Sequence, residues 1–264
     1  MLMEVKNQFK ISFLSVKYAL MREMLNKTTF ITNVLFMILN NASFIVQWIV
    51  LFSLKDNVGG YTFDQVMLLW GISAGTYGVS HFFFSNSYHL SELINNGKLD
   101  SFLVQPKNVL LSVITTDVTT SALGDIIYGY LMVLIFGLTP LNLLLFTVFS
   151  ILGGITLTCI SIILNSLSFW FSKTDVIADT GNNMMTNFAN YPDGIFKGGI
   201  KLMFFTILPV AFVNHIPVQL LTKFNLGLFL IVVLVTIIFI ILAFTIFYKG
   251  LKRYSSSNLM VARI

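Results

Sequence analysis

The chain has 264 residues, of which 56% are hydrophobic and only 10% are charged, and its mean hydropathy is +0.85. Because an ordinary soluble domain has about 25% charged residues, this composition excludes that class and indicates an all-α integral membrane protein. The net charge of +5 does not indicate nucleic-acid binding, since the basic residues follow the membrane topology described below. The single cysteine, Cys159, excludes a disulfide framework.

Residues 1–28 are predicted to form an amphipathic helix at the membrane interface. Lysines on one face, Lys6, Lys10 and Lys17, would meet anionic headgroups. The apolar side chains recur at helical spacing on another face: Phe9, Phe13, Val16, Leu20 and Met24. A cleavable signal peptide is the alternative, but the basic region is too long and no small-residue cleavage site closes the apolar stretch.

Six apolar stretches are predicted to cross the bilayer, each needing roughly 20 residues as a helix. They cover residues 30–54, 63–85, 109–138, 141–171, 198–214 and 226–248. Pro209 inside the fifth stretch and Pro217 after it predict a kink, followed by a short extracellular re-entrant half-helix at residues 215–223. The whole chain, residues 1–264, is therefore predicted to be one transmembrane domain.

Polar residues inside two of these spans are candidates for a transport pathway or an interface. Asn33, Asn40 and Gln47 recur every seven residues, so their side chains should face protein or a water-filled cavity rather than lipid. Contact between helices of one subunit is the alternative. Asp125 lies deep in the third span, where a carboxyl group needs a partner or a cavity, and Pro209 adds a backbone break to the candidates.

The second span combines small residues with two histidines. Gly71, Gly75 and Gly78 lie on adjacent turns and should let another helix approach closely. His81 and His89 are two helical turns apart with no third ligand nearby, so no metal site is predicted.

Residues 172–197 are the least membrane-like part of the second half of the chain. They contain Lys173, Asp175, Asp179 and an Asn-rich run that ends at Asn190. We expect a helix at the cytoplasmic surface here. A segment that enters the membrane is the alternative.

Basic residues predict the orientation of the spans. With six spans and a cytoplasmic N-terminus, fourteen basic residues lie inside, Lys173, Lys197, Lys201 and Arg263 among them, and only Lys55 and Lys223 lie outside. This bias predicts that both termini are cytoplasmic. It also places residues 90–108, LSELINNGKLDSFLVQPKN, in the cytoplasm as a coupling loop that a soluble partner can reach.

Two segments carry a family resemblance: GKLDSFLVQPKN at residues 97–108, and YPDGIFKGGIKLMFFTILPVAFVNHIPVQLL at residues 191–221. Together with the six spans, they resemble the permease subunits of type-2 ABC transporters, in the branch of export permeases with a G-x-LD-x-x-L-x-x-P loop and a YP-x-x-IF segment. The resemblance covers nearly the whole chain. Gln105 departs from it, because a basic residue is expected before the proline.

This resemblance implies a non-catalytic export permease of the plasma membrane. It would work with a second permease, identical or paralogous, above two ATP-binding subunits that carry ATP and Mg. The sequence contains no G-x-x-x-x-G-K-[ST] phosphate loop, and no cofactor is expected on this chain. A coupling helix at residues 91–103 would meet the ATPase through Glu92, Lys98, Leu99, Asp100 and Phe102.

Two other classes of protein compete with this interpretation. A secondary transporter or channel would be expected to show inverted repeats or several intramembrane charges, and only Asp125 is clearly deep. An intramembrane enzyme would need a pair such as Glu-Glu, His-Glu or Ser-His converging within the spans, and the sequence predicts none.

Overall fold

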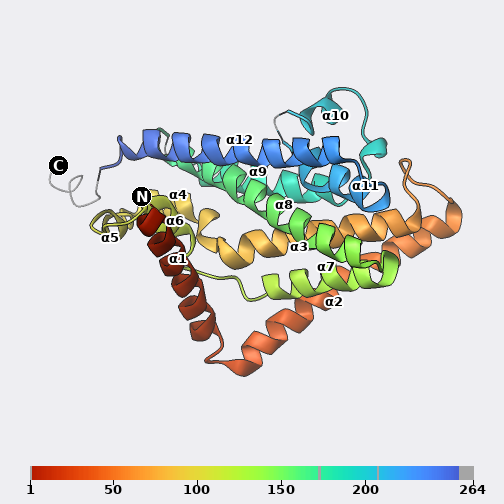
Figure 1. The fold of residues 1–264 in the computed structure, drawn as a ribbon, viewed down its shortest axis with the longest axis horizontal. Helices are drawn as coiled ribbons and strands as arrows, with labels where there is room; N and C mark the ends of the chain where they lie inside the picture. Colours follow the sequence, from red (N-terminus) through yellow and green to blue (C-terminus); the bar gives the residue numbers. More distant parts are fainter. Residues whose placement is uncertain (1, 172–173, 207, 256–264) are drawn as a thin grey trace.

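A computed structural model describes residues 2–171, 174–206 and 208–255 (Figure 1). Over these ranges the secondary structure is helical, apart from one isolated β-bridge between Val58 and Tyr61. The predicted all-α class is therefore confirmed. Lys173 and Arg263, two of the basic residues predicted to lie inside, fall outside the described ranges.

Six helices form an elongated bundle with α3 at its centre. α3 packs against α7 and α8, and α8 packs in turn against α12. Within the described residues, three helices are long and apolar enough to cross a membrane, at Lys27–Leu54, Pro140–Phe169 and Leu226–Leu251, and Ala122–Phe136 is a shorter apolar helix. The bundle consists of α2 (Lys27–Leu54), α3 (Phe63–Phe83), α7 (Ala122–Phe136), α8 (Pro140–Ser166), α9 (Asp175–Ala189) and α12 (Leu226–Leu251).

Glycines let α3 and α7 cross at close range. A Cβ atom built on Gly129 would lie 2.8 Å from the carbonyl oxygen of Gly71, and one on Gly78 would lie 2.8 Å from that of Ala122. Backbone atoms cannot move aside as the end of a flexible side chain can. The close helix approach predicted for the glycines of the second span is confirmed.

The N-terminal helix α1 (Leu2–Glu23) is steeply inclined to the bundle and meets α2 at a sharp corner (Figure 1). Val16 and Ala19 are buried in a cluster with Phe82 of α3, whereas Phe9 and Phe13 are exposed. An apolar face left uncovered beside the bundle is typical of a helix that lies in the membrane interface.

Three short helices gather at one end of the bundle, which we call the α4 end: α4 (Leu90–Asn95), α5 (Asp100–Leu103) and α6 (Val109–Ile114) (Figure 1). The backbone N–H of Ser91 donates to Asn165 Oδ1 of α8 at 3.2 Å, which fixes α4 to the bundle. The single coupling helix predicted at residues 91–103 is instead two helices. Gly97 separates them because its φ of 68° turns the chain.

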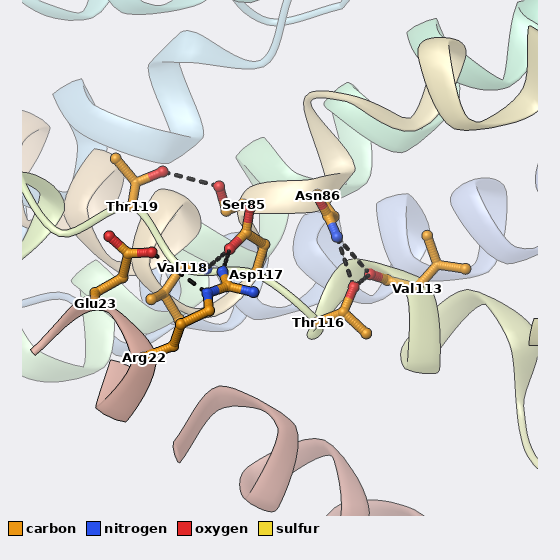
Figure 2. Close-up of polar contacts among 9 residues, drawn as sticks. All are labelled: Arg22, Glu23, Ser85, Asn86, Val113, Thr116, Asp117, Val118 and Thr119. Atoms are coloured by element: carbon orange, nitrogen blue, oxygen red, sulfur yellow. Dashed lines mark hydrogen bonds and ion pairs between the residues drawn. The ribbon is translucent and has the colours of Figure 1, made fainter. Parts of the chain in front are cut away.

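The predicted third span, residues 109–138, is broken at residues 115–121, between α6 and α7. Thr116 Oγ1 donates to the carbonyl oxygen of Val113 at 2.7 Å, and Asn86 Nδ2, from the turn η1 (Ser85–Ser87), donates to Thr116 Oγ1 at 2.6 Å (Figure 2). Side chains that bond to the backbone in this way compete with helical hydrogen bonds. The prediction of one continuous helix was therefore wrong.

α9 follows the turn η2 (Leu167–Phe169), which contacts α4, and it packs along α8. Just after α9 ends, Asn190 Oδ1 accepts a hydrogen bond from Ser73 Oγ, halfway along α3, at 2.5 Å. The next turn, η3 (Asp193–Ile195), packs on Gly59 so tightly that a Cβ on Gly194 would meet the Gly59 carbonyl group. We call this opposite end of the bundle the α11 end.

The predicted fifth span, residues 198–214, is not one helix. It contains α10 (Gly199–Met203), a turn at residues 204–206 and the π-helical turn η4 (Ala211–His215), and then α11 (Ile216–Thr222) follows. Pro209 interrupts the segment because a proline has no backbone N–H to donate. α11 lies within residues 215–223, where the sequence predicts a half-helix.

The α11 end also holds Lys201. Its Nζ pairs with Asp193 Oδ2 at 2.9 Å, and both residues line a hollow of about 350 Å³ together with Gly59. The charge count put Lys201 inside and the turn at Gly59 outside. Lys201 and Gly59 line the same hollow, so one cannot be inside the membrane barrier and the other outside, and these two expectations conflict. The expectation that is less well supported is that the fifth span begins at residue 198.

Candidate functional site

A groove with polar walls runs between α2, α3, α7 and α9, and we call it the polar groove. It comprises two hollows of about 190 and 230 Å³ that share Tyr77 and Thr186 as walls. Its polar lining residues are Asn40, Asn41, Ser73, Tyr77, His81, Tyr88, Asp125, Asp179, Asn182, Asn183, Thr186 and Asn190.

α9 supplies one wall of the polar groove from a single helical face. Asp179, Asn182 and Thr186 follow each other at spacings of three and four residues, which brings their side chains to the same face. On an adjacent face of the helix, Ala178 and Met185 are buried. One face of this Asn-rich segment, for which the sequence predicts a helix at the cytoplasmic surface, thus lines the polar groove, where Asp179 and Asn183 are exposed.

The deepest polar contact in the groove joins α2 to α7. Asp125 is only 4% exposed, and its Oδ1 accepts a hydrogen bond from Asn41 Nδ2 at 2.6 Å. Its other oxygen, Oδ2, is buried without a hydrogen-bond partner among the described residues. A buried carboxyl group satisfied on one side only is poised to receive a further ligand.

Three stacked rings form the wall near the α4 end. The His81 ring lies between those of Tyr77 and Tyr88, with centroid distances of 3.7 and 3.8 Å. The Tyr88 hydroxyl also exchanges a hydrogen bond with Ser80 at 2.8 Å. These contacts hold His81 within the wall and leave it unsuited to act as one of several metal ligands.

The predicted pathway residues lie in different places. Asn40 lines the polar groove, and Asp125 lies at its base. Asn33 Nδ2 donates to Thr120 Oγ1 at 3.1 Å, so it acts as a contact between helices. Gln47 is exposed and does not line the groove, and Pro209 is buried at the break after α10.

Sequence reasoning missed Asn41, which makes the contact to Asp125. The seven-residue pattern selected its neighbour Asn40, but an α-helix has 3.6 residues per turn, so a strict repeat of seven drifts around the helix. The adjacent Asn40-Asn41 pair in an apolar span was the available signal. Asn182 and Asn190 were visible only as part of an Asn-rich run.

The predicted coupling residues differ in exposure: two are exposed, Asp100 and Phe102 are half-buried, and Leu99 is buried. Glu92 and Lys98 are exposed and pair at 3.1 Å, and this hydrogen bond and charge lower the pKa of the Glu92 carboxyl. Asp100 Oδ1 accepts a hydrogen bond from the Tyr254 hydroxyl at 3.0 Å, and Phe102 is half-buried. Leu99 is fully buried in the core of the α4 end, where its side chain packs within the protein.

The surface beyond α5 is a better candidate for contact with a partner. Residues 103–107, LVQPK, are all exposed, and Val104 is 84% exposed. Apolar side chains held at the tip of a short loop indicate an interaction site.

The residues that the structure describes include no group of three or more His, Cys, Asp or Glu side chains that could hold a metal ion. Burial also raises the pKa of the Tyr254 hydroxyl, with Asp100 beside it, to about 12, so this group stays a hydrogen-bond donor at neutral pH.

The long apolar helices are those of an integral membrane protein. Residues 16–258 match the profile of a family described as ABC-2 family transporter protein, and the chain belongs to this family. It is therefore a membrane permease of the ABC transporter type. No curated protein and no solved structure matches the chain.

Proposed function

We propose that this chain is the membrane-spanning permease subunit of an ATP-driven exporter and that the polar groove is its part of the translocation pathway. The groove is the observation that carries the proposal: amide, hydroxyl and carboxyl side chains line it, inside a bundle with an apolar outer surface. Polar groups at such depth face a partner or a water-filled path. A second permease, identical or paralogous, would complete the pathway.

α9, with the turns that flank it, is the fifth membrane crossing in this proposal. Its packing along α8 and its exit at the α11 end support the assignment. Lys197 and Lys201 then lie outside with Lys55 and Lys223, and twelve of the sixteen basic residues remain inside. The positive-inside bias is kept, with the α4 end in the cytoplasm.

The partner ATPase would dock at the α4 end, on residues 103–107 and the exposed pair of Glu92 and Lys98. ATP and Mg would be bound by that partner. Closure of two ATPase subunits on ATP would push this surface and shift the permease between two membrane conformations.

A chain of hydrogen bonds supports transmission from this surface to the groove. Ser91 N–H donates to Asn165 Oδ1 at 3.2 Å, and Asn165 Nδ2 donates to the Ser161 carbonyl oxygen at 2.9 Å. Asn182 Nδ2, in the groove wall, donates to Ser161 Oγ at 3.3 Å. Movement of α4 would therefore reach α9 through α8.

The docking assignment is tested by photo-crosslinking in living cells. A benzophenone amino acid in place of Val104 should form an adduct in which mass spectrometry finds an ATP-binding-cassette protein. The same amino acid in place of Leu39, which is 62% exposed on α2, is the control and should give no such adduct. An ATPase adduct from position 39 but not from position 104 would overturn the proposal.

A further inference from the structure

The hollow of about 230 Å³ in the polar groove combines one carboxyl group with aromatic rings. Asp125 lines it, with the buried and unpartnered Oδ2 atom described above. Phe44 and Trp70 line it as a stacked pair with a centroid distance of 4.7 Å, and Tyr77 closes it on the side of the second hollow. The hollow thus offers one acidic group and several aromatic faces.

Basic side chains do not balance this acidic group. Neither hollow has Lys or Arg among its described lining residues, and the second hollow adds another carboxyl group, that of Asp179. His81 is the one lining residue that can carry a positive charge, and it is stacked between two tyrosine rings. The described lining of the groove therefore has acidic side chains without basic side chains to balance them.

Physical chemistry identifies the kind of ligand that meets these conditions. A carboxyl group in a low-dielectric site is stable in its charged form only where a cation pairs with it. The faces of Trp, Tyr and Phe rings attract cations as well. A neutral or anionic ligand would leave the carboxylate unpaired.

We propose that the polar groove binds an amphipathic organic cation, with its ammonium group at Asp125 and its apolar part against Phe44 and Trp70. This inference deepens the proposed function, on which it rests, by naming the class of substrate. The two hollows together fall in the size range of small-molecule sites, roughly 300–1,000 Å³. Asn41 holds the Asp125 carboxyl group in place for the contact.

The test compares three ligands of similar shape on the full chain in nanodiscs of zwitterionic lipid. They are benzyltrimethylammonium, its uncharged carbon isostere neopentylbenzene, and the anion benzylsulfonate. Tryptophan fluorescence reports binding, since Trp70 lines the hollow. Wild-type protein should bind the cation at least tenfold more tightly than the other two, whereas equal affinity for all three would overturn the proposal.

Asp125→Asn should lower the affinity for the cation at least tenfold and leave that for the uncharged isostere unchanged. Asp117→Asn removes one negative charge away from the groove and is the matched control; it should bind like the wild type. Retention of cation affinity by a folded Asp125→Asn variant would overturn the proposal. If that variant does not fold, the comparison of ligands on the wild type still decides.

The comparison of ligands and the comparison of variants both work without an ATPase. A negative result in either one can therefore be distinguished from failure of the proposed function. If the protein binds all three ligands equally but position 104 forms an ATPase adduct, only the proposed substrate class is wrong. If the protein prefers the cation but position 104 forms no ATPase adduct, only the docking assignment is wrong.

Discussion

Arg22 at the end of α1 pairs with Asp117 in the break between α6 and α7, and the Nη2–Oδ1 distance is 2.5 Å (Figure 2). Both side chains are about half exposed, at 58% and 41%, so the pair contributes at most about 1 kcal/mol to stability. Its importance is positional. It joins the interfacial helix to the point where the third span is interrupted.

Asp117→Asn should free the end of α1 from this point. Hydrogen exchange of the backbone amides at residues 18–26 should become about two- to fivefold faster, because a pair worth up to about 1 kcal/mol no longer opposes local opening. Mass spectrometry of peptides from this region measures the change. Glu23→Gln removes the other partner of Arg22, at 3.5 Å, without touching the break, and should leave the exchange unchanged.

Gly129→Ala should destabilise the crossing of α3 and α7. The added methyl group would press on the Gly71 carbonyl oxygen, and overpacking of this kind costs about 1–3 kcal/mol. We expect the unfolding temperature in detergent to fall by roughly 3–10 °C. Gly199→Ala is the control, because nothing lies within 4 Å of its added Cβ; an equal loss in both variants would contradict the close crossing.

Leu99→Ala should destabilise the protein by about 2–5 kcal/mol, because it empties a fully buried site in the core of the α4 end. Val104→Ala should change stability by less than about 0.5 kcal/mol, since that side chain is 84% exposed. Thermal unfolding of the two variants distinguishes a packing residue from a contact residue. Similar small losses would show that Leu99 is not a core residue.

Cysteine labelling tests α9 as the fifth crossing. Asn57→Cys and Gly199→Cys should react with an impermeant thiol reagent added to intact cells, and Asn96→Cys should react only after the cells are opened. The native Cys159 is 5% exposed, so the background is low. Protection of Gly199→Cys together with Asn96→Cys would place α10 in the cytoplasm and rule out the assignment.

The ion pair of Asp193 and Lys201 should make stability depend on acid pH. Partial burial alone would raise the pKa of Asp193, but hydrogen bonds from Lys201 and Tyr61 and the nearby His215 lower it below the ordinary 3.8. Because the folded-state pKa is lowered, the stabilisation is present above pH 3.8 and is lost as the pH falls through the folded-state value.

Asp193→Asn should therefore lower the unfolding temperature at pH 7 by up to about 3 °C, as expected for a partly exposed pair. The difference from the wild type should shrink below pH 4. A difference that is constant between pH 7 and pH 3 would mean that packing, and not charge, explains the effect.

The long helices were predictable because their signal is local. α2, α8 and α12 are continuous apolar stretches, and the glycines that allow α3 and α7 to cross are visible as a spaced series. The break between α6 and α7 was not predictable in this way. It depends on Asn86, nearly thirty residues earlier, which bonds to Val113 and Thr116.

The candidate site shows the same division between local and distant information. Asp125 was identified because a carboxyl group in an apolar span is conspicuous on its own. Its partner Asn41 and the α9 wall required knowledge of how distant segments face each other. The polar composition of α9 predicts a helix at the surface, and it does not show that one face of this helix lines the polar groove.

The length of α2 makes its tilt depend on the thickness of the membrane. Only Asn41 and Trp48 are buried among its 28 residues, so most of its side chains face away from the bundle. A helix of this length extends about 42 Å, against a hydrocarbon core of about 30 Å, and must incline to fit. A thinner bilayer should increase the tilt of α2 and so shift Asn41 relative to Asp125. The acyl-chain length of the lipids would then control the depth of the groove.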